Sequence, residues 1–132
     1  MGRWLARQGV RPDHIVASPA QRARQTVQLV CQELGCPLEG IHWDPRIYAA
    51  EVADLLRVLA DIPAQAGRVL LVGHNPGLEL LVGHLLVGHR AAEVVIKTAT
   101  VVFLHLTAEW NAVAGGGCAR LGTLLNPRDI DD

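Results

Sequence analysis

The sequence predicts an α/β fold with a mainly parallel sheet, because apolar strand-like runs alternate with helical patterns along most of the chain. Two segments, residues 14–30 and 68–81, each combine a short apolar run, a tight turn and the start of a helix. Hydrophobic residues make up 50% of the 132 positions and charged residues 19%, which is ample for a packed core and excludes a disordered chain. The length predicts a single domain.

The first third of the chain predicts a helix, a strand and a second helix. Residues Met1–Gln8 are expected to end a helix that Gly9 closes. The run His14–Ala17 predicts a strand. The segment Pro19–Leu34 predicts a helix, because its apolar positions recur at helical spacing, and Gly35 is expected to end it.

The middle of the chain continues the alternation. Ile41–Trp43 predicts a short strand and Tyr48–Ala60 a helix. The positions expected to face the core are Val52, Leu55, Leu56 and Leu59. Val69–Val72, a β-branched and leucine run, predicts an inner parallel strand. Gly77–Val87 predicts a helix closed by Gly88.

The last third predicts strands. Val94–Lys97 and Val101–Thr107 are rich in β-branched residues, and Ala114–Gly117 has the composition of a turn. Cys118–Leu125 predicts a weaker strand, followed by a tail after Pro127.

The segment Arg68–Leu81, RVLLVGHNPGLELL, predicts an anion site. His74 lies where a strand ends, and ligands bind at the carboxyl ends of strands in open α/β sheets. Gly73 permits a backbone conformation that a side chain would block. Pro76 is expected at the first helical position and Asn75 as the helix cap. The N–H groups and the positive dipole end of this helix would then point at an anion beside His74.

The earlier junction predicts a second contribution to the same site. Ser18 is expected to cap a helix whose first residue is Pro19. Arg22 and Arg24 fall in its first turns, where the helix dipole disfavours cations. We therefore expect at least one of these two guanidinium groups to face an anion, since a guanidinium offers a planar fork of donors to phosphate oxygens. Arg24 points elsewhere on the helix, and an ordinary solvated role is favoured.

Charge and cysteine content exclude several other classes of function. The formal net charge of −1 predicts no general affinity for nucleic acid or membranes. Cys31, Cys36 and Cys118 are an odd set without metal or redox spacing, which favours reduced thiols and a cytoplasmic protein. No apolar run reaches the roughly 18 residues of a membrane span, and the N-terminus lacks the pattern of a signal peptide.

Three motifs resemble the histidine phosphatase superfamily (phosphoglycerate mutase-like), and within it the small bacterial SixA-type phosphohistidine phosphatases. They are SPAQRARQT at Ser18–Thr26, LLVGHNPG at Leu70–Gly77 and LGTLLNPRDI at Leu121–Ile130. The resemblance implies one histidine phosphatase-like domain over residues 1–132. It also implies a three-layer fold, with helices on both faces of the central sheet.

The resemblance further implies a protein phosphohistidine phosphatase that passes the phosphoryl group to an active-site histidine and then to water. It needs no metal or other cofactor. Arg22 resembles the arginine that clamps the phosphoryl oxygens, and His74 the histidine that donates a hydrogen bond to them. Ser18, Asn75 and Thr98 are expected to contact the substrate, a protein with a phosphorylated histidine, or an anion such as inorganic phosphate.

The sequence departs from the family in one respect: it contains no Arg-His-Gly, the motif that carries the nucleophile at the end of the family's first strand. The first strand and the start of the first helix, about 25–30 residues of a βαβ unit, have no counterpart. Either the natural protein starts upstream of Met1 or the nucleophile has been lost; we expect the first, and that the chain as given is inactive. The family's acidic proton donor also has no obvious counterpart, because Glu51 and Asp54 fit the polar face of a helix.

Two other functions remain open. One is a non-catalytic module that binds phosphate or a phosphoprotein through Arg22 and His74. The other is a small-molecule phosphomonoesterase of the same superfamily, which the small size of the chain disfavours. An in-frame Arg-His-Gly upstream of Met1 would favour the enzyme.

Overall fold

The computed structural model describes residues 11–86, 101–106 and 119–125, together with Arg7, Gly9, Glu109, Trp110 and Ala112. Of the first expected helix, Arg7 is helical and Gly9 has a φ of +70°, as expected for a helix end. The expectations that concern Gly88, Val94–Lys97, Thr98, Ala114–Gly117 and the tail after Pro127 lie outside these residues.

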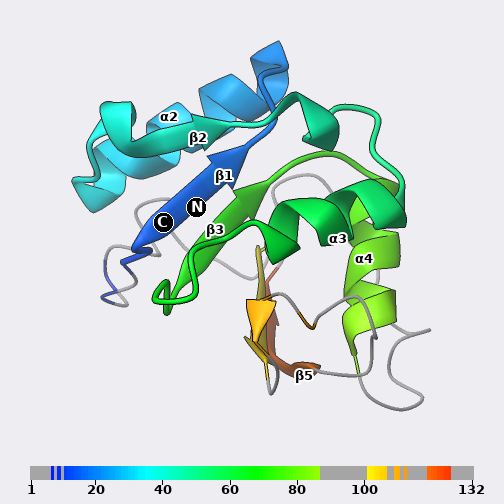
Figure 1. Ribbon diagram of the computed structural model, residues 1–132. Coiled ribbons are helices and arrows are strands. Elements are labelled where there is room, and N and C mark those ends of the chain that lie inside the picture. Colours follow the sequence, from blue (N-terminus) through cyan, green and yellow to red (C-terminus); the bar gives the residue numbers. More distant parts are fainter. Residues whose placement is uncertain are drawn as a thin grey trace.

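A three-stranded parallel sheet forms the centre of the fold (Figure 1). Its strands are β1 (His14–Ala17), β2 (Ile41–Trp43) and β3 (Val69–Val72), in the order β2-β1-β3. All three have the bounds that the sequence predicts. Because β1 lies in the middle, its carboxyl end is flanked by the ends of both neighbours.

Helices cover both faces of this sheet, so the α/β prediction with three layers is confirmed (Figure 1). Ile15 and Ala17 pack against α2 (Gln21–Leu34) on one face. Val16 points to the other face, toward α3 (Val52–Ala60) and α4 (Gly77–Leu85). This alternation along β1 is the two-residue period of a strand with both faces buried.

Helix α2 ends where the sequence predicts, at Gly35, whose φ of +74° places it in the left-handed region. The N–H groups of Gly35 and Cys36 both donate to the carbonyl of Cys31, which closes the last turn. A single 3₁₀ turn, η1 (Leu38–Gly40), then leads into β2.

Within the described residues, no helix is long and apolar enough to cross a membrane.

Helix α3 begins at Val52 rather than at Tyr48, so the expected start is wrong by one turn. A separate 3₁₀ helix, η2 (Pro45–Ile47), comes first, and Ala49 has a φ of +51°, which interrupts any continuous helix. The carboxylate of Asp54 accepts from the Glu51 N–H at 3.0 Å and caps α3. On its apolar face Leu55 and Leu59 are buried as expected, Val58 is buried as well, and Val52 and Leu56 are half-buried.

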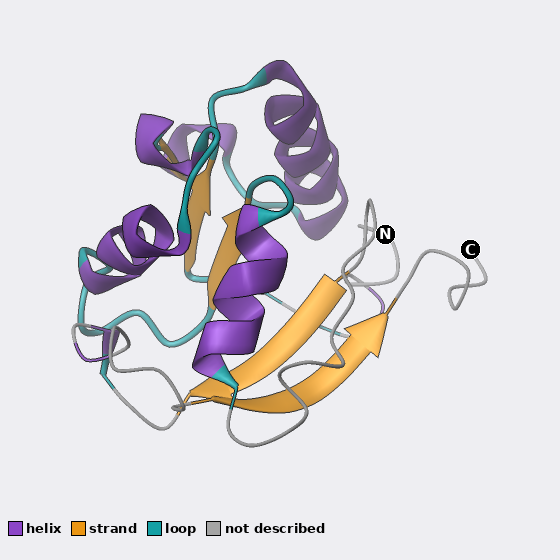
Figure 2. Ribbon diagram, turned by 90° about the vertical axis from the view of Figure 1, so that its right-hand side faces the viewer, coloured by secondary structure: helices purple, strands orange, loops and turns teal. Residues whose placement is uncertain are grey.

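The strands β4 (Val101–Leu106) and β5 (Ala119–Leu125) pair antiparallel in a sheet of their own (Figure 2). Their register shifts between Phe103 and Leu104. An isolated bridge joins Leu86, at the end of α4, to Ala119. Because both residues are buried in the core that α3 and α4 share, this second sheet is anchored to the α4 side of the molecule.

Candidate functional site

The carboxyl ends of the three parallel strands meet at one edge of the sheet. β1 runs into Ser18, β2 into Asp44 and β3 into Gly73 and His74. The Ser18 N–H donates to the Val72 carbonyl at 3.0 Å, and the Asp44 N–H donates to the Ala17 carbonyl at 2.9 Å. The three loops that leave this edge are therefore tied together through their backbones.

Ser18 and His74 contact each other across this edge. The distance between Ser18 Oγ and His74 Nε2 is 2.8 Å. Ser18 is fully buried and His74 is half-buried. A hydroxyl group can donate to a neutral imidazole nitrogen or accept from a protonated one. The contact is therefore available in both charge states of His74, and it holds the ring at the end of β3.

The expectation that Ser18 caps α2 is wrong. The helix starts at Gln21 with Ala20 as its N-cap residue, and no side chain caps it. The Ser18 hydroxyl instead accepts from the Ala20 N–H at 3.2 Å and turns inward to His74. Pro19 consequently lies before the helix rather than at its first position. The contact with His74, 56 residues away in the sequence, is the reason that a local capping rule fails here.

The junction between β3 and α4 differs from the prediction in the same way. Pro76 is the N-cap residue of α4, not its first helical residue. Asn75 contributes to capping from one residue earlier, because its Oδ1 accepts from the Glu79 N–H at 3.2 Å. The carbonyl of His74 accepts from the Leu78 N–H at 3.1 Å. These two first-turn N–H groups are thus engaged within the helix start. Contact between an anion and the other N–H groups around Asn75 stays a prediction.

The segment 44–51, which joins β2 to α3 and contains η2, is called the η2 loop. Two glycines allow it to approach this junction closely. A Cβ atom on Gly73 would lie 2.8 Å from Ile47 Cγ2, and one on Gly77 would lie 2.7 Å from the Ala50 carbonyl oxygen. Gly73 has no positive φ. The expected backbone reason for this glycine is therefore wrong, and close packing with Ile47 is the reason instead.

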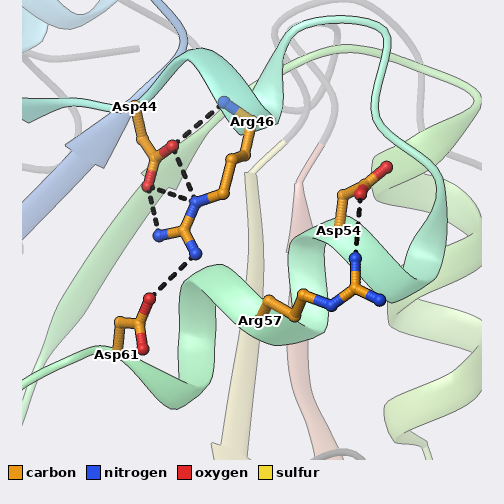
Figure 3. A network of polar contacts seen from close by, with 5 residues as sticks. All are labelled: Asp44, Arg46, Asp54, Arg57 and Asp61. Atoms are coloured by element: carbon orange, nitrogen blue, oxygen red, sulfur yellow. Dashed lines mark hydrogen bonds and ion pairs between the residues drawn. The ribbon is translucent and has the colours of Figure 1, made fainter.

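Ion pairs fasten the η2 loop to the end of α3 (Figure 3). Arg46 Nη2 lies 2.7 Å from Asp44 Oδ2, and Arg46 Nη1 lies 2.8 Å from Asp61 Oδ2. Hydrogen bonds from Arg46 lower the pKa of the Asp44 carboxyl group. Because Asp44 directly follows β2, the loop is fixed at both ends.

This loop brings Tyr48 to His74, a neighbour that the sequence reasoning missed. The two ring centroids are 5.8 Å apart and the ring planes are inclined by 86°, an edge-to-face contact. The sequence predicts that Tyr48 begins a helix, but its position depends on packing between Ile47 and Gly73 that no local pattern encodes. The one available signal is that it is the only tyrosine in the chain.

Arg22 and Arg24 lie in the first turns of α2, as expected, and both are exposed. The guanidinium of Arg24 stacks over the Trp43 ring, 5.2 Å from its centroid, in agreement with the ordinary role favoured for it. Over the described ranges, the guanidinium of Arg22 has no hydrogen bond or ion pair. Its contact with an anion stays a prediction, and Thr98 lies outside the described residues.

The chemistry available at this edge suits a small anion. Ser18 contacts Nε2 of His74, so the ring has a second nitrogen, Nδ1, to offer. Arg22 adds a cation within the first turn of α2. The N-termini of α2 and α4, which carry the positive ends of the helix dipoles, both begin here. In the part of the chain that the structure describes, no three histidine, cysteine or acidic side chains gather as metal ligands.

Comparisons with known proteins bear on the family and on the fold. The sequence model of the histidine phosphatase superfamily (branch 1) matches residues 1–46. No curated protein matches the chain.

Solved structures are similar over nearly the whole chain, among them the following three. A candidate phosphohistidine phosphatase SixA from Nakamurella multipartitia has a TM-score of 0.79 and 25% identity, over 96% of this chain and 77% of that one. A candidate phosphohistidine phosphatase SixA from Agrobacterium tumefaciens has a TM-score of 0.76 and 26% identity, over 96% and 75%. The protein histidine phosphatase SixA complexed with tungstate has a TM-score of 0.80 and 21% identity, over 98% and 78%.

Sequence and structure therefore confirm the resemblance to the histidine phosphatase superfamily. Within that superfamily, the structural likeness is to the SixA proteins.

Proposed function

We propose that this chain forms the phosphoryl-binding part of a SixA-type protein phosphohistidine phosphatase. The observation that carries the proposal is the 2.8 Å contact between Ser18 and His74, which joins two strand-to-helix junctions at one sheet edge. The names of the structurally similar proteins and the match to the superfamily support the same activity.

In this proposal the described side chains act by electrostatics. His74 donates a hydrogen bond to the phosphoryl group, and Ser18 keeps its ring in place. The guanidinium of Arg22 binds phosphoryl oxygens, with Asn75 and Thr98 as further substrate contacts. Fixed donors of this kind stabilise the charge of the transferring group, which is the main requirement of phosphoryl transfer. The histidine nucleophile is not assigned to any of the 132 residues, because they contain no Arg-His-Gly.

The proposed substrate is a protein that carries a phosphorylated histidine, and the product is inorganic phosphate. We place this activity in the cytoplasm, in signal transduction.

Anion binding by the 132-residue chain tests the site. Calorimetric titration with tungstate and with inorganic phosphate should show one binding site, and His74→Ala should weaken binding at least about tenfold, since a hydrogen bond to a charged group contributes roughly 1.5–3 kcal/mol. His84→Ala, which replaces an exposed histidine at the other end of α4, is the matched control and should bind as the wild type does. Equal effects of the two substitutions would contradict the proposal.

A second candidate is a module that binds phosphate or a phosphoprotein without hydrolysing it, because the contact between Ser18 and His74 serves binding as well as catalysis. Hydrolysis assays separate the candidates. Protein expressed with the in-frame codons upstream of Met1 should release phosphate from a phosphohistidine peptide faster than from p-nitrophenyl phosphate. Anion binding without hydrolysis would favour the module, and the reverse substrate order would favour a small-molecule phosphomonoesterase.

A further inference from the structure

Tyr48 is an exposed aromatic residue on a fixed backbone. Its side chain is 64% exposed, whereas its neighbour Ile47 is only 1% exposed. The ring stands edge-to-face with His74, at a centroid distance of 5.8 Å. Tyr48 thus belongs to the rim of the anion site, although most of its surface remains in solvent.

Contacts on both sides of Tyr48 fix its backbone. Ile47 packs against Gly73 so closely that a Cβ atom there would lie 2.8 Å away, and the carbonyl of Ala50 approaches Gly77 in the same manner. The Tyr48 N–H donates to the Pro45 carbonyl at 3.2 Å, and Arg46 ties the same turn to Asp61 (Figure 3). The loop, and not burial of the ring, sets the position of Tyr48. A ligand that meets this ring therefore orders no further backbone at Tyr48, and only the two side-chain torsions of the ring lose freedom.

We propose that Tyr48 determines substrate specificity by contacting the flat ring that carries the phosphoryl group. The inference rests on the proposed function and deepens it. A phosphoryl group held by His74 places its parent side chain beside the Tyr48 ring. An imidazole ring can pack against an aromatic ring edge-to-face or offset-stacked, whereas the short alkyl group of phosphoserine cannot. Tyr48 thus favours phosphohistidine over phosphoserine at the same anion site.

The test measures binding of three ligands to the 132-residue chain. They are inorganic phosphate, a peptide with a triazole phosphonate that mimics phosphohistidine without hydrolysing, and the same peptide with phosphoserine. The wild type should bind the triazole peptide more tightly than the phosphoserine peptide. Tyr48→Ala should reduce this affinity ratio by roughly 2- to 12-fold, the range expected for an aromatic pair. Tyr48→Phe should keep the ratio within about twofold of the wild type, because it keeps the ring.

Leu29→Ala is the matched control. Leu29 is also 64% exposed, but it lies eight residues beyond the first residue of α2, roughly 12 Å along the helix. Its replacement should leave the ratio unchanged.

The two proposals fail in different ways. If Tyr48→Ala leaves the ratio unchanged, or Tyr48→Phe loses it, the role of the Tyr48 ring is overturned while phosphate binding that depends on His74 still supports the proposed function. If the wild type binds no phosphate, both are overturned.

Discussion

At the residue scale, the sequence locates the ends of the strands but not the contacts between them. His74 could be assigned to a strand end because Val69–Val72 precedes it and a glycine and a proline surround it. The hydrogen bond between His74 and Ser18 could not be predicted, since a serine at position 18 also fits the local pattern of a helix cap. The structure selects the long-range hydrogen bond over the local cap.

The first prediction at this scale concerns Ser18. Ser18→Ala should weaken binding of inorganic phosphate by roughly 2- to 12-fold, the equivalent of one hydrogen bond of about 0.5–1.5 kcal/mol. The reason is that the substitution releases the His74 ring from its fixed position and leaves the Ala20 N–H without its acceptor. Thr26→Ala is the control, because that hydroxyl bonds the Arg22 carbonyl within the same helix. A loss as large with Thr26→Ala would show that the effect is not specific to the contact with His74.

The second prediction concerns the two arginines of α2. Arg22→Ala should weaken phosphate binding at least about tenfold, because it removes a charge-assisted contact. Arg24→Ala removes the same formal charge two residues away, but its guanidinium stacks on Trp43. Calorimetry on the two variants should therefore show a loss for the first and almost none for the second. Equal losses would mean that only the overall charge matters.

At the element scale, the three parallel strands could be predicted with their bounds, whereas the starts of α2 and α3 could not. Each of the three parallel strands is a short apolar run between turn residues, so its limits are local. The starts of α2 and α3 depend instead on contacts distant in the sequence. Ser18 forms a hydrogen bond with His74, and Ile47 packs against Gly73. The turn after Ile47 contains Ala49 at positive φ, which no propensity rule would assign to alanine.

The third prediction tests how closely these elements approach. Gly77→Ala should destabilise the fold by about 1–3 kcal/mol, because its Cβ would meet the backbone carbonyl of Ala50, which cannot rotate away. This loss exceeds the gain in helix propensity, at most about 1 kcal/mol. Gly73→Ala should be destabilising in the same range, since it displaces the buried side chain of Ile47.

Urea unfolding measures both changes in the free energy of unfolding. The control is Gly40→Ala, where an added Cβ would meet nothing within 4 Å. If Gly77→Ala left the free energy of unfolding as unchanged as the control does, the close approach of Ala50 to α4 would be contradicted.

At the scale of the whole molecule, the edge of the sheet opposite the site carries titratable groups. Asp13 accepts from the Gly67 N–H at 2.9 Å and from the Arg68 N–H at 3.1 Å, which joins segments 54 and 55 residues apart. The rings of His14 and His42 stack with their centroids 4.5 Å apart. These contacts hold the amino ends of the strands together, and they make the stability of the fold dependent on pH.

The last prediction follows from the direction of the pKa shifts. Burial, with a contribution from His42, lowers the pKa of His14 below its usual 6.5. The unfolded chain then binds this proton more tightly than the folded chain, so the free energy of unfolding should fall as the pH drops below 6.5 and until it passes the folded pKa. Backbone hydrogen bonds lower the pKa of Asp13 below 3.8. Its stabilisation is complete above that pH and is lost as the pH falls through the folded pKa.

Urea unfolding measured across pH should therefore show two separate losses of stability. His14→Gln should weaken the upper one and leave the lower one, whereas Asp13→Asn should weaken the lower one and leave the upper one. The lower loss should persist in part with Asp13→Asn, because the pKa of Asp44 is also lowered by its partner Arg46 at the other edge of the sheet. A single loss that neither substitution changes would show that these contacts do not control the acid stability of the fold.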